Sequence, residues 1–502
     1  MMSRALSYPG MQTIWVFGDQ LNRRIGALAD ADPPSTRVLM VESAGLIDAG
    51  RHVQRLHFVL AAMRRFAAEL SSEGFTVDIR RAPSLAAGLS AHRDAYRPEE
   101  VIATEPNSRE ARALCKRSGV VQVRSDQFLS HADDFREWMA DRASLRMESF
   151  YRWNRRRLGY LMDGDAPVEG RWNFDQDNRE PPPDDPSIFS EPPRSTLDRV
   201  DEEVLASLPD THGERPVGLW ATTRAGAMGR LEHFLDHELA RFGPYEDAMT
   251  ARSWSLAHSM LSPYLNVGLL LPGEVCDAVE ARYRAGEIPV NSAEGFIRQV
   301  VGWREFVWGL YWAMPELVEA NALDNDRPLP ATFTGTASTH MRCVADVLAG
   351  LQDRAWVHHI PRLMILANLA NLYGSEPRLV KDWMLDQYID AADWVMVPNV
   401  MGMGMWADGG RMASKPYVSG GAYISRMSDY CGDCRYDHRA RTGADACPFT
   451  TLYWDFLACH ETRLAGNHRL ARPLAAMRRL SDLDAVRDRA EQIRRAIADG
   501  TA

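Results

Sequence analysis

The sequence predicts an α/β domain with a parallel sheet, then a connector, then a large all-α domain. Three observations support this order. Short apolar runs alternate with helical patterns in the first part, proline-rich sequence follows, and helical periodicity without strands continues to the end. A chain of 502 residues with 45% hydrophobic content is long enough for two or more domains. We therefore expect domains at 1–130 and 221–502, joined by a linker at 131–220.

The first domain contains a series of short apolar runs typical of buried strands, at 13–17, 38–41, 75–79, 101–104 and 120–123. Helical patterns separate them, notably at 51–73 and 108–117. This alternation indicates βαβ units and a parallel, Rossmann-like sheet. Ligands of such sheets bind beyond the carboxyl ends of the strands, which places Gly18, Asp19, Glu42 and Glu105 on the expected rim. No G-x-G-x-x-G motif occurs, so a dinucleotide site is unsupported there.

The second part has prolines at 181–183, 186 and 192–193, and its 170–175 segment is aromatic. A connector of this length is usually functional or packed across a domain boundary, and its Arg and aromatic content favours packing. Beyond it, a helical stripe is formed by Trp303, Phe306, Val307, Leu310 and Tyr311, at i, i+3, i+4, i+7 and i+8.

The composition and the order of residues argue against several classes of protein. There is no run of eighteen apolar residues and no basic-then-apolar leader, so we expect a soluble cytoplasmic protein without a membrane partner. A net charge of −10 argues against non-specific nucleic-acid binding. A local basic patch at Arg152 and 155–157, interleaved with Tyr151 and Trp153, keeps DNA possible, whereas the arginine-rich tail at 463–495 is diluted by acids and favours a solvated face.

The cysteines suggest a metal site. Seven cysteines are too few for a disulfide framework at this length. Cys431-x2-Cys434 is a chelating spacing, and Cys447-Pro448 follows it. Cys343 is the best fourth ligand and Cys459-His460 its rival. Four thiolates suit zinc or an iron–sulfur cluster equally. The alternative is a chance C-x-x-C with a buried, structural Cys343.

Two further motifs favour an organic cofactor. Ser259 and Ser262 precede Pro263 at the start of a helix, where backbone N–H groups can bind a phosphate, although an ordinary N-cap explains Ser262 equally well. Gln299 and Arg304 flank the apolar stripe, and a guanidinium there needs a cofactor or an acidic partner. A structural Arg–Glu pair is the default interpretation.

The remaining motifs are Trp356-Val-His358-His359 and the window from Trp383 through Asp390 and Asp393 to Asn399. Adjacent histidines on a helix do not chelate one ion as an i, i+4 pair does. One of them can donate a proton, because imidazole titrates near neutrality; a packed structural histidine is the alternative. The Trp/Asp/Asn window suggests the wall of a cofactor pocket.

In this order, the motifs resemble the cryptochrome/photolyase family over nearly the whole chain. They begin with the Gly18-Asp19-Gln20-Leu21 turn and end with the cysteines. The cysteine pattern, Trp356-Val-His358-His359 and Asp429-Tyr430-Cys431 are similar to the prokaryotic iron–sulfur bacterial cryptochromes and (6-4) photolyases. The resemblance implies FAD in the helical domain and a [4Fe–4S] cluster on Cys343, Cys431, Cys434 and Cys447. It also implies a 6,7-dimethyl-8-ribityllumazine antenna near Gly18, Asp19, Gln20 and Glu42.

The resemblance also implies roles for single residues. The FAD contacts it implies are Tyr245, Ser259, Leu261, Ser262, Gln299, Arg304, Trp356, Asp390, Asp393 and Asn399. Trp383 matches the flavin-proximal electron donor, and His359, with His358 beside it, matches the histidine that protonates the lesion. His258 stands where many relatives have threonine. Leu363 replaces the second histidine of animal (6-4) enzymes, and Met384 follows Trp383 where relatives use an aromatic; Trp394, Tyr388 or Trp356 could substitute.

The resulting expectation is a monomeric (6-4) photolyase that repairs UV-damaged DNA with light and is associated with the nucleoid. Its mechanism is electron transfer from excited reduced flavin to a flipped-out lesion. The alternative is a blue-light photoreceptor cryptochrome with the same cofactors. A third hypothesis, a zinc-bound helical scaffold without flavin, requires every flavin motif to be a coincidence.

Overall fold

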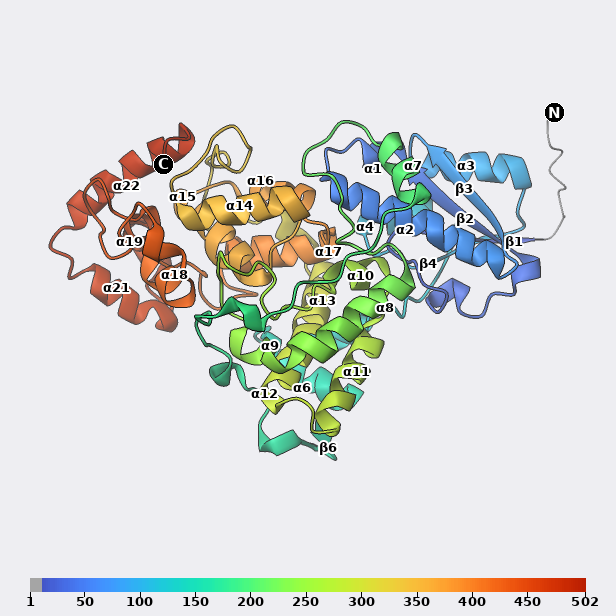
Figure 1. Cartoon of the computed structure of the whole chain (residues 1–502), viewed down its shortest axis with the longest axis horizontal. Helices are drawn as coiled ribbons and strands as arrows, with labels where there is room; N and C mark the ends of the chain where they lie inside the picture. The colour runs from blue at the N-terminus through green and yellow to red at the C-terminus, as the bar shows by residue number, and fades with distance from the viewer. Residues whose placement is uncertain (1–10) are drawn as a thin grey trace.

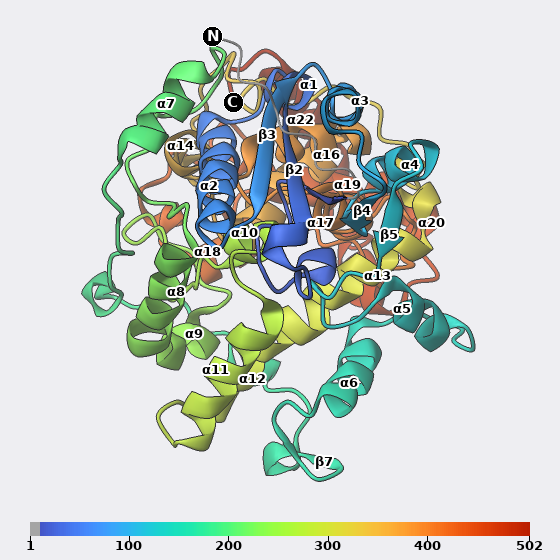
Figure 2. The same cartoon turned by 90° about the vertical axis from the view of Figure 1, so that its right-hand side faces the viewer.

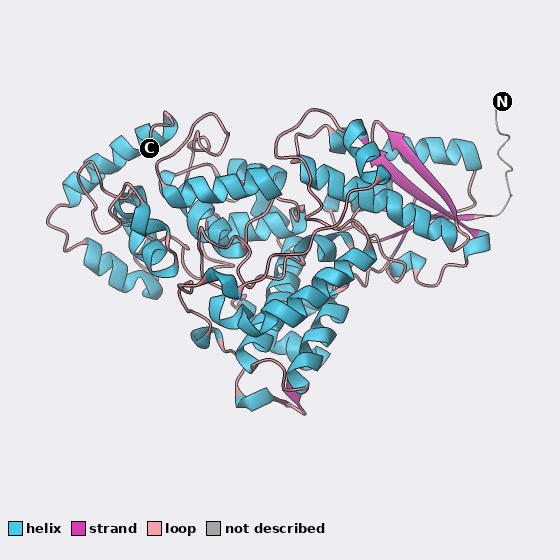
Figure 3. Ribbon diagram, in the orientation of Figure 1, coloured by secondary structure: helices cyan, strands magenta, loops and turns pink. Residues whose placement is uncertain are grey.

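A parallel sheet forms the amino-terminal part of the computed structural model, which describes residues 11–502 (Figures 1 and 3). Residues 1–10 lie outside the described residues. They include the start of the predicted first domain and the stretch in which no leader peptide was expected. The strands lie in the order β3-β2-β1-β4-β5. They are β1 (Gln12–Val16), β2 (Thr36–Ser43), β3 (Thr76–Ala82), β4 (Val101–Thr104) and β5 (Val121–Val123). The predicted α/β fold and each predicted strand are confirmed.

Helices cover both faces of this sheet. They are α1 (Ala44–Ile47), α2 (Val53–Ser72), α3 (Leu85–Tyr96) and α4 (Arg109–Arg117). In Figure 2, α2 and α3 lie on opposite sides of β2 and β3. The alternation of side chains along β1 explains this. Ile14 and Val16 pack in the core that contains α2, while Trp15 and Phe17, the residue directly after β1, pack with Leu89 of α3. The strand order reverses between β1 and β4, which is where such sheets bind ligands.

The connector is more structured than the sequence suggested. It contains α5 (Ala132–Met139), α6 (Met147–Leu158), α7 (Arg199–Ser207) and a small hairpin of β6 (Met162–Asp163) and β7 (Ala166–Pro167). Arg155 of α6 is fully buried and donates hydrogen bonds to the backbone oxygens of Tyr160 and Leu161 at 2.9 and 2.6 Å. Arg152 pairs with Glu148 at 2.8 Å. Arg155 therefore has a structural role, whereas Arg152, Arg156 and Arg157 of the basic patch are exposed.

The rest of the chain is helical, as predicted, and no β-strand follows β7 within residues 11–502. The α-helices are α8 (Arg224–His233), α9 (Leu239–Tyr245), α10 (Ser262–Val267), α11 (Pro272–Arg284), α12 (Val290–Ile297), α13 (Glu305–Ala313), α14 (Arg342–Arg354), α15 (Asn368–Tyr373), α16 (Pro377–Gln387), α17 (Asp393–Met396), α18 (Gly421–Met427), α19 (Pro448–Cys459), α20 (Glu461–Leu464), α21 (Ala471–Met477) and α22 (Leu483–Ala498). Among the described residues, none of the helices combines the length and apolar character needed to cross a bilayer.

One apolar core joins the sheet to the first helices of the helical region. Residues from Leu219 to Val301 pack in the same cluster as Ile14 and Val16. The turn after β1 is fixed to the end of α10, because the Leu21 N–H donates to Val267 O at 2.8 Å. A second core contains the predicted stripe on α13 and holds Phe135 and Phe150 of the connector. The connector thus packs against the helices that form the cavity described below.

Gly309 provides a test of this packing. A Cβ built at Gly309 of α13 would lie 2.1 Å from the Phe135 ring, which is itself packed among aromatic side chains. We expect Gly309→Ala to lower the free energy of unfolding by about 1–3 kcal/mol through overpacking. Urea denaturation of the variant measures this. Gly229→Ala in α8 is the matched control, because nothing lies within 4 Å of its Cβ position, and an equal loss in both variants would contradict the packing argument.

Candidate active site

A cavity of about 1040 Å³ opens among the helices of the carboxyl-terminal region. Its volume is at the upper end of the range for small-molecule and cofactor sites. Three π-helical segments contribute to its wall, η7 (Arg298–Arg304), η9 (Pro361–Ala367) and η10 (Val397–Gly404). Such i→i+5 turns are rare and occur frequently at functional sites. The same wall includes Met260, whose φ of +56° is unusual for a residue with a side chain.

Most residues expected to contact a flavin line this one cavity. They are Ser259, Leu261, Ser262, Gln299, Arg304, Trp356, Asp390 and Asn399, and His358 and His359 line it as well. Tyr245 and Asp393 are not among the lining residues. Tyr245 packs edge-on against Phe189 with ring centroids 5.5 Å apart. Asp393 is the first residue of α17, next to the lining residue Trp394.

Trp383 also lies behind the cavity wall. Its ring stacks on Phe333 with centroids 4.5 Å apart, and its Nε1–H donates to Phe333 O at 2.8 Å. The wall at this point is formed by the next residue, Met384, and by Tyr388 and Trp394. Of the aromatic residues considered as substitutes in an electron route, Trp394, Tyr388 and Trp356 therefore all reach the cavity.

A buried polar network fixes one side of the cavity. Asp390 accepts two hydrogen bonds from the Arg362 guanidinium, at 2.9 and 3.0 Å. Its Oδ2 also accepts one from the Ser262 hydroxyl at 2.6 Å. The Ser262 side chain therefore connects the start of α10 to the segment before α17. The site role of Arg362 was not apparent from the sequence.

The hydrogen bonds of Asp390 predict how its replacement changes the free energy of unfolding. Replacing Asp390 by Asn removes the charge opposite Arg362, whose side chain is 21% exposed. We expect Asp390→Asn to cost about 3 kcal/mol, because an uncompensated, largely buried charge remains. Chemical denaturation gives the value, and Glu319→Gln is the control, since that residue belongs to an exposed pair with Arg378 whose loss should cost about 0.5 kcal/mol or less. Equal effects would contradict the buried-pair argument.

Several buried polar atoms of the wall have no hydrogen-bond partner within residues 11–502. They are Arg304 Nε, His358 Nδ1 and Tyr388 Oη. Arg304 does form the expected structural pair with an acidic side chain, because its Nη1 lies 3.1 Å from Glu305 Oε1. Its guanidinium also lies 4.1 Å from the Phe128 ring centroid. Burial nevertheless lowers the pKa of Arg304 from its ordinary value. Because unpaired buried polar atoms are costly, these groups indicate a wall built to contact a polar ligand. The residues present fit an FAD-sized, partly polar molecule.

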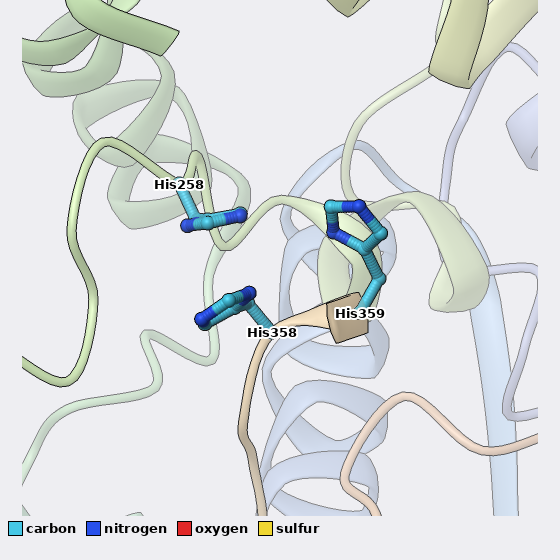
Figure 4. Close-up of side chains that lie close together, drawn as sticks. All are labelled: His258, His358 and His359. Carbon is cyan, nitrogen blue, oxygen red and sulfur yellow. The ribbon is translucent and has the colours of Figure 1, made fainter. Parts of the chain in front are cut away.

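The histidines gather at one end of the cavity (Figure 4). His258 and His358 stack with ring centroids 4.0 Å apart and an interplanar angle of 23°. Burial lowers the pKa of His358 well below its ordinary value and that of His258 to about 3. His359 differs from both, because its side chain is 48% exposed and its Nε2 lies 3.7 Å from Asp247 Oδ1.

Three cationic side chains without an acidic partner among the described residues line the cavity. Lys415, Arg426 and Arg469 line the cavity, and both arginines are exposed. None of the three forms an ion pair with another residue of the described chain. Uncompensated cations beside a cavity attract anionic ligands. Arg469 belongs to the 463–495 tail that was interpreted as a solvated face, while Arg426 on α18 and Lys415 on an irregular segment belong to none of the motifs.

The four cysteines of the predicted metal site line a second, small cavity. Cys343 lies on α14, Cys431 lies in the 3₁₀ helix η11 (Tyr430–Asp433) and Cys434 directly follows it; Cys447 directly precedes α19. Cys459, the rival ligand, ends α19 and is exposed. About eighteen ångströms of helix separate the two ends of α19. The fold brings together the cysteine set that includes Cys343.

The rim residues of the sheet lie away from the large cavity. Burial raises the pKa of Asp19 to about 6 although Asn107 donates to its carboxylate at 3.0 Å. Gln20 is buried, and its Oε1 has no hydrogen-bond partner in the part of the chain that the structure describes. Glu42 accepts two hydrogen bonds from Arg64, at 2.7 and 3.0 Å. Gly18 packs close to α2, where a Cβ would lie 2.9 Å from Met63 Sδ.

Comparisons with known proteins agree with this architecture. A family described as "Deoxyribodipyrimidine photo-lyase-related protein" matches residues 14–218. A (6-4) photolyase of Agrobacterium fabrum is 42% identical over 489 residues, which cover 94% of this chain and 96% of that protein. A deoxyribodipyrimidine photo-lyase of the same organism is 30% identical over 226 residues, 41% of this chain and 45% of that protein.

A solved structure shows the same fold. A bacterial class III photolyase from Agrobacterium tumefaciens superposes with a TM-score of 0.60 at 18% identity, over 99% of this chain and 100% of that one. The identity to the (6-4) photolyase extends over almost the full length of both proteins. On this evidence the chain belongs to the photolyase family, in its prokaryotic (6-4) photolyase and cryptochrome branch.

Proposed function

We propose that this protein is a light-driven DNA repair enzyme, a (6-4) photolyase that reverts pyrimidine–pyrimidone (6-4) photoproducts. The proposal rests on one observation: most residues expected to contact the flavin line the same cavity as His358 and His359. Full-length identity of 42% to a (6-4) photolyase supports the lesion class. The cations that line the cavity, Lys415, Arg426 and Arg469, supply the charge that a DNA backbone needs.

The wall residues hold FAD in this proposal, with Arg304, Gln299 and Asn399 as polar contacts and Trp356 as an aromatic one. Ser259, Leu261 and Ser262 line the phosphate-binding turn, and Tyr245 and Asp393 support the wall from behind. When bound and reduced, FAD supplies the light-excited electron that the lesion requires. Trp383 remains the proposed donor for photoreduction, with Trp394 directly in the wall.

His359 is the proposed proton donor to the lesion. Its exposed ring lies at the cavity, and the Asp247 carboxylate, at ion-pair distance, orients it. His358 is buried and presents an unpartnered Nδ1 from the same wall, which makes it a contact for a flipped-out base.

The cysteine cavity is proposed to hold a [4Fe–4S] cluster. Among the described residues, the group His258, His358 and His359 is the one set of three potential metal ligands whose ligand atoms all lie within 4.8 Å of one another. The sulfurs of the four cysteines are therefore spaced more widely than this in any group of three. A tetrahedral zinc ion with bonds of 2.3 Å holds its sulfurs roughly 3.8 Å apart. A cluster places four irons between its thiolates and needs a wider cage.

The α/β domain at 1–130 is proposed to carry the lumazine antenna at the rim formed by Gly18, Asp19, Gln20 and Glu42. The unpartnered Gln20 Oε1 supports a polar ligand there. We further propose a linker at 131–220 and an FAD and iron–sulfur domain at 221–502. The protein would act as a monomer on UV-damaged DNA in the cytoplasm, at the nucleoid.

One experiment tests the function. Purified protein is illuminated with blue light under reducing conditions in the presence of a (6-4)-containing oligonucleotide, and lesion loss is followed by chromatography. We expect light-dependent loss of the lesion and flavin absorbance in the preparation. No lesion loss from a flavin-loaded, iron-replete sample would refute repair and favour the photoreceptor function.

A further inference from the structure

One stretch of the connector, residues 180–190, follows Arg179, which lines the large cavity together with Asp175. We call it the proline stretch, because it contains four prolines. Figure 1 shows it in green beside α9, and the Glu180 N–H donates to a backbone oxygen of α9 at 3.0 Å. Apart from the single turn η5 (Pro186–Ile188), the stretch has no regular structure. Neither a helix nor a sheet therefore holds it at the cavity.

The proline stretch is held through its carbonyl oxygens. Proline has no backbone N–H, so its carbonyl is the backbone group that can be bonded from outside. Arginine suits this task, because it carries several N–H donors and no acceptor. Arg252 Nη1 donates to Asp184 O at 2.5 Å, and its Nη2 donates to Pro183 O at 3.2 Å. Among the described residues, Arg252 is the one residue outside 181–189 that hydrogen-bonds to this segment, and the buried Phe189 is an apolar anchor.

The same guanidinium is bound to the segment that leads into the cysteine cavity. Arg252 Nε donates to Asp429 Oδ2 at 2.8 Å, and Asp429 precedes Cys431 by two residues. The other oxygen of the Asp429 carboxylate accepts from the Ala251 N–H at 3.0 Å. One side chain therefore connects the proline stretch, the loop after α9 and the segment before the cysteines.

The effect of Arg252 is local. Its side chain is 44% exposed, so the ion pair with Asp429 alone contributes little to the free energy of unfolding. The planar guanidinium nevertheless fixes three segments at once. A stretch without regular structure opens more readily than the helices around it. Loss of Arg252 should therefore release the stretch without unfolding the protein.

We propose that Arg252 is a positioning residue that holds the proline stretch at the cavity and links it to the cysteine segment, residues 428–447. Displacement of the cysteine segment, as on loss of its metal, removes the anchor at Asp429 and frees the stretch. This inference rests on the proposed flavin site for its consequence, which is that the cysteine segment controls how fast FAD leaves the cavity.

Hydrogen–deuterium exchange, followed by mass spectrometry, tests the hold on the iron-replete, flavin-loaded protein. We expect Arg252→Ala to raise the exchange rate of the amides at 184–190 by about 10- to 100-fold, with unchanged iron content and unfolding midpoint. FAD dissociation, followed as the rise in flavin fluorescence on dilution, should accelerate by about 10-fold or more. Unchanged exchange would overturn the role of Arg252, and unchanged dissociation would overturn the control of flavin release.

Arg252→Lys separates the bridge from the charge. Lysine keeps a positive charge near Asp429, but its single ammonium cannot reproduce the fork that binds a carboxylate and two carbonyls together. Exchange should therefore resemble that of Arg252→Ala, and parent-like exchange would overturn the bridge. Arg171→Ala is the matched control, because Arg171 forms a similarly exposed pair with Asp177 inside the connector, at 3.0 Å. Raised exchange at 184–190 in that variant as well would mean general loosening and would overturn the specific role.

The link to the cysteine segment is tested with Asp429→Ala and Cys434→Ser. Each should raise exchange at 184–190 in the parent protein and add nothing when combined with Arg252→Ala, because the connection is then already broken. Asp429→Ala keeps all four cysteines and should keep its iron, so it decides the question where Cys434→Ser does not fold. Additive effects in the double variants would overturn the link.

The repair assay keeps this inference apart from the proposed function, because exchange requires neither light nor lesion. Raised exchange in Arg252→Ala, with no light-driven repair by the parent protein, overturns the proposed function and leaves the role of Arg252. Repair by the parent protein, with unchanged exchange in Arg252→Ala, overturns the role of Arg252 alone.

Discussion

His359→Ala should reduce light-driven repair by about 10²- to 10⁴-fold while FAD remains bound, because that range is typical of a lost general acid. The His359 side chain is 48% exposed, and Asp247 is its one ion-pair partner among the described residues. Its removal therefore creates no buried cavity. Repair is measured as lesion loss per absorbed photon, and FAD content from flavin absorbance.

Two companion variants identify the proton as the cause. His359→Gln keeps a hydrogen-bonding side chain but has no titratable proton, so it should lose as much repair as His359→Ala. Asp247→Asn leaves the imidazole in place and should cost only about tenfold, as expected for an orienting group. Substantial repair by His359→Gln would contradict proton donation and leave His359 as a binding contact.

Much of the fold follows from local sequence patterns. Buried parallel strands are continuous apolar runs, so the inner strands β2, β1 and β4 were recognisable; all eight residues of β2, for example, are buried, whereas the edge strands β3 and β5 contain no buried residue. The α6 helix was not predicted, because four arginines obscure its apolar face, and Arg155 is buried through backbone contacts that only the tertiary structure creates. Residue type alone cannot distinguish a buried arginine from a DNA-binding one.

The candidate site was predicted less completely, for two physical reasons. Its wall uses π-helical segments, whose side chains depart from the 3.6-residue period on which sequence patterns depend. Its polar network and histidine cluster also join segments distant in sequence, such as Ser262 with Asp390 and His258 with His358. The sequence motifs contained single members of these sets. The contacts between the members became visible only in the three-dimensional structure.

Cys434→Ser should yield protein with less than the full iron content and a free energy of unfolding lower by at least about 3 kcal/mol, because metal ligation is coupled to folding. The segment between α18 and α19 contains little regular structure. Outside the cysteines it contacts α14 through the exposed Arg342–Asp433 pair at 2.8 Å and through the buried Tyr430, whose hydroxyl donates to Asp346 at 2.8 Å. Long irregular segments of this kind need a cross-link to be ordered.

Cys459→Ser is the matched control for this prediction, since Cys459 is exposed and does not line the cysteine cavity. It should keep its iron and its unfolding midpoint. Iron is counted by mass spectrometry, and stability is followed by thermal unfolding monitored through the circular-dichroism signal of the helices.

Because α14 carries Cys343 and directly precedes Trp356 and the histidine pair, loss of the cluster should also loosen the flavin wall. A Cys434→Ser protein with full iron and unchanged stability would show that Cys434 is not a ligand.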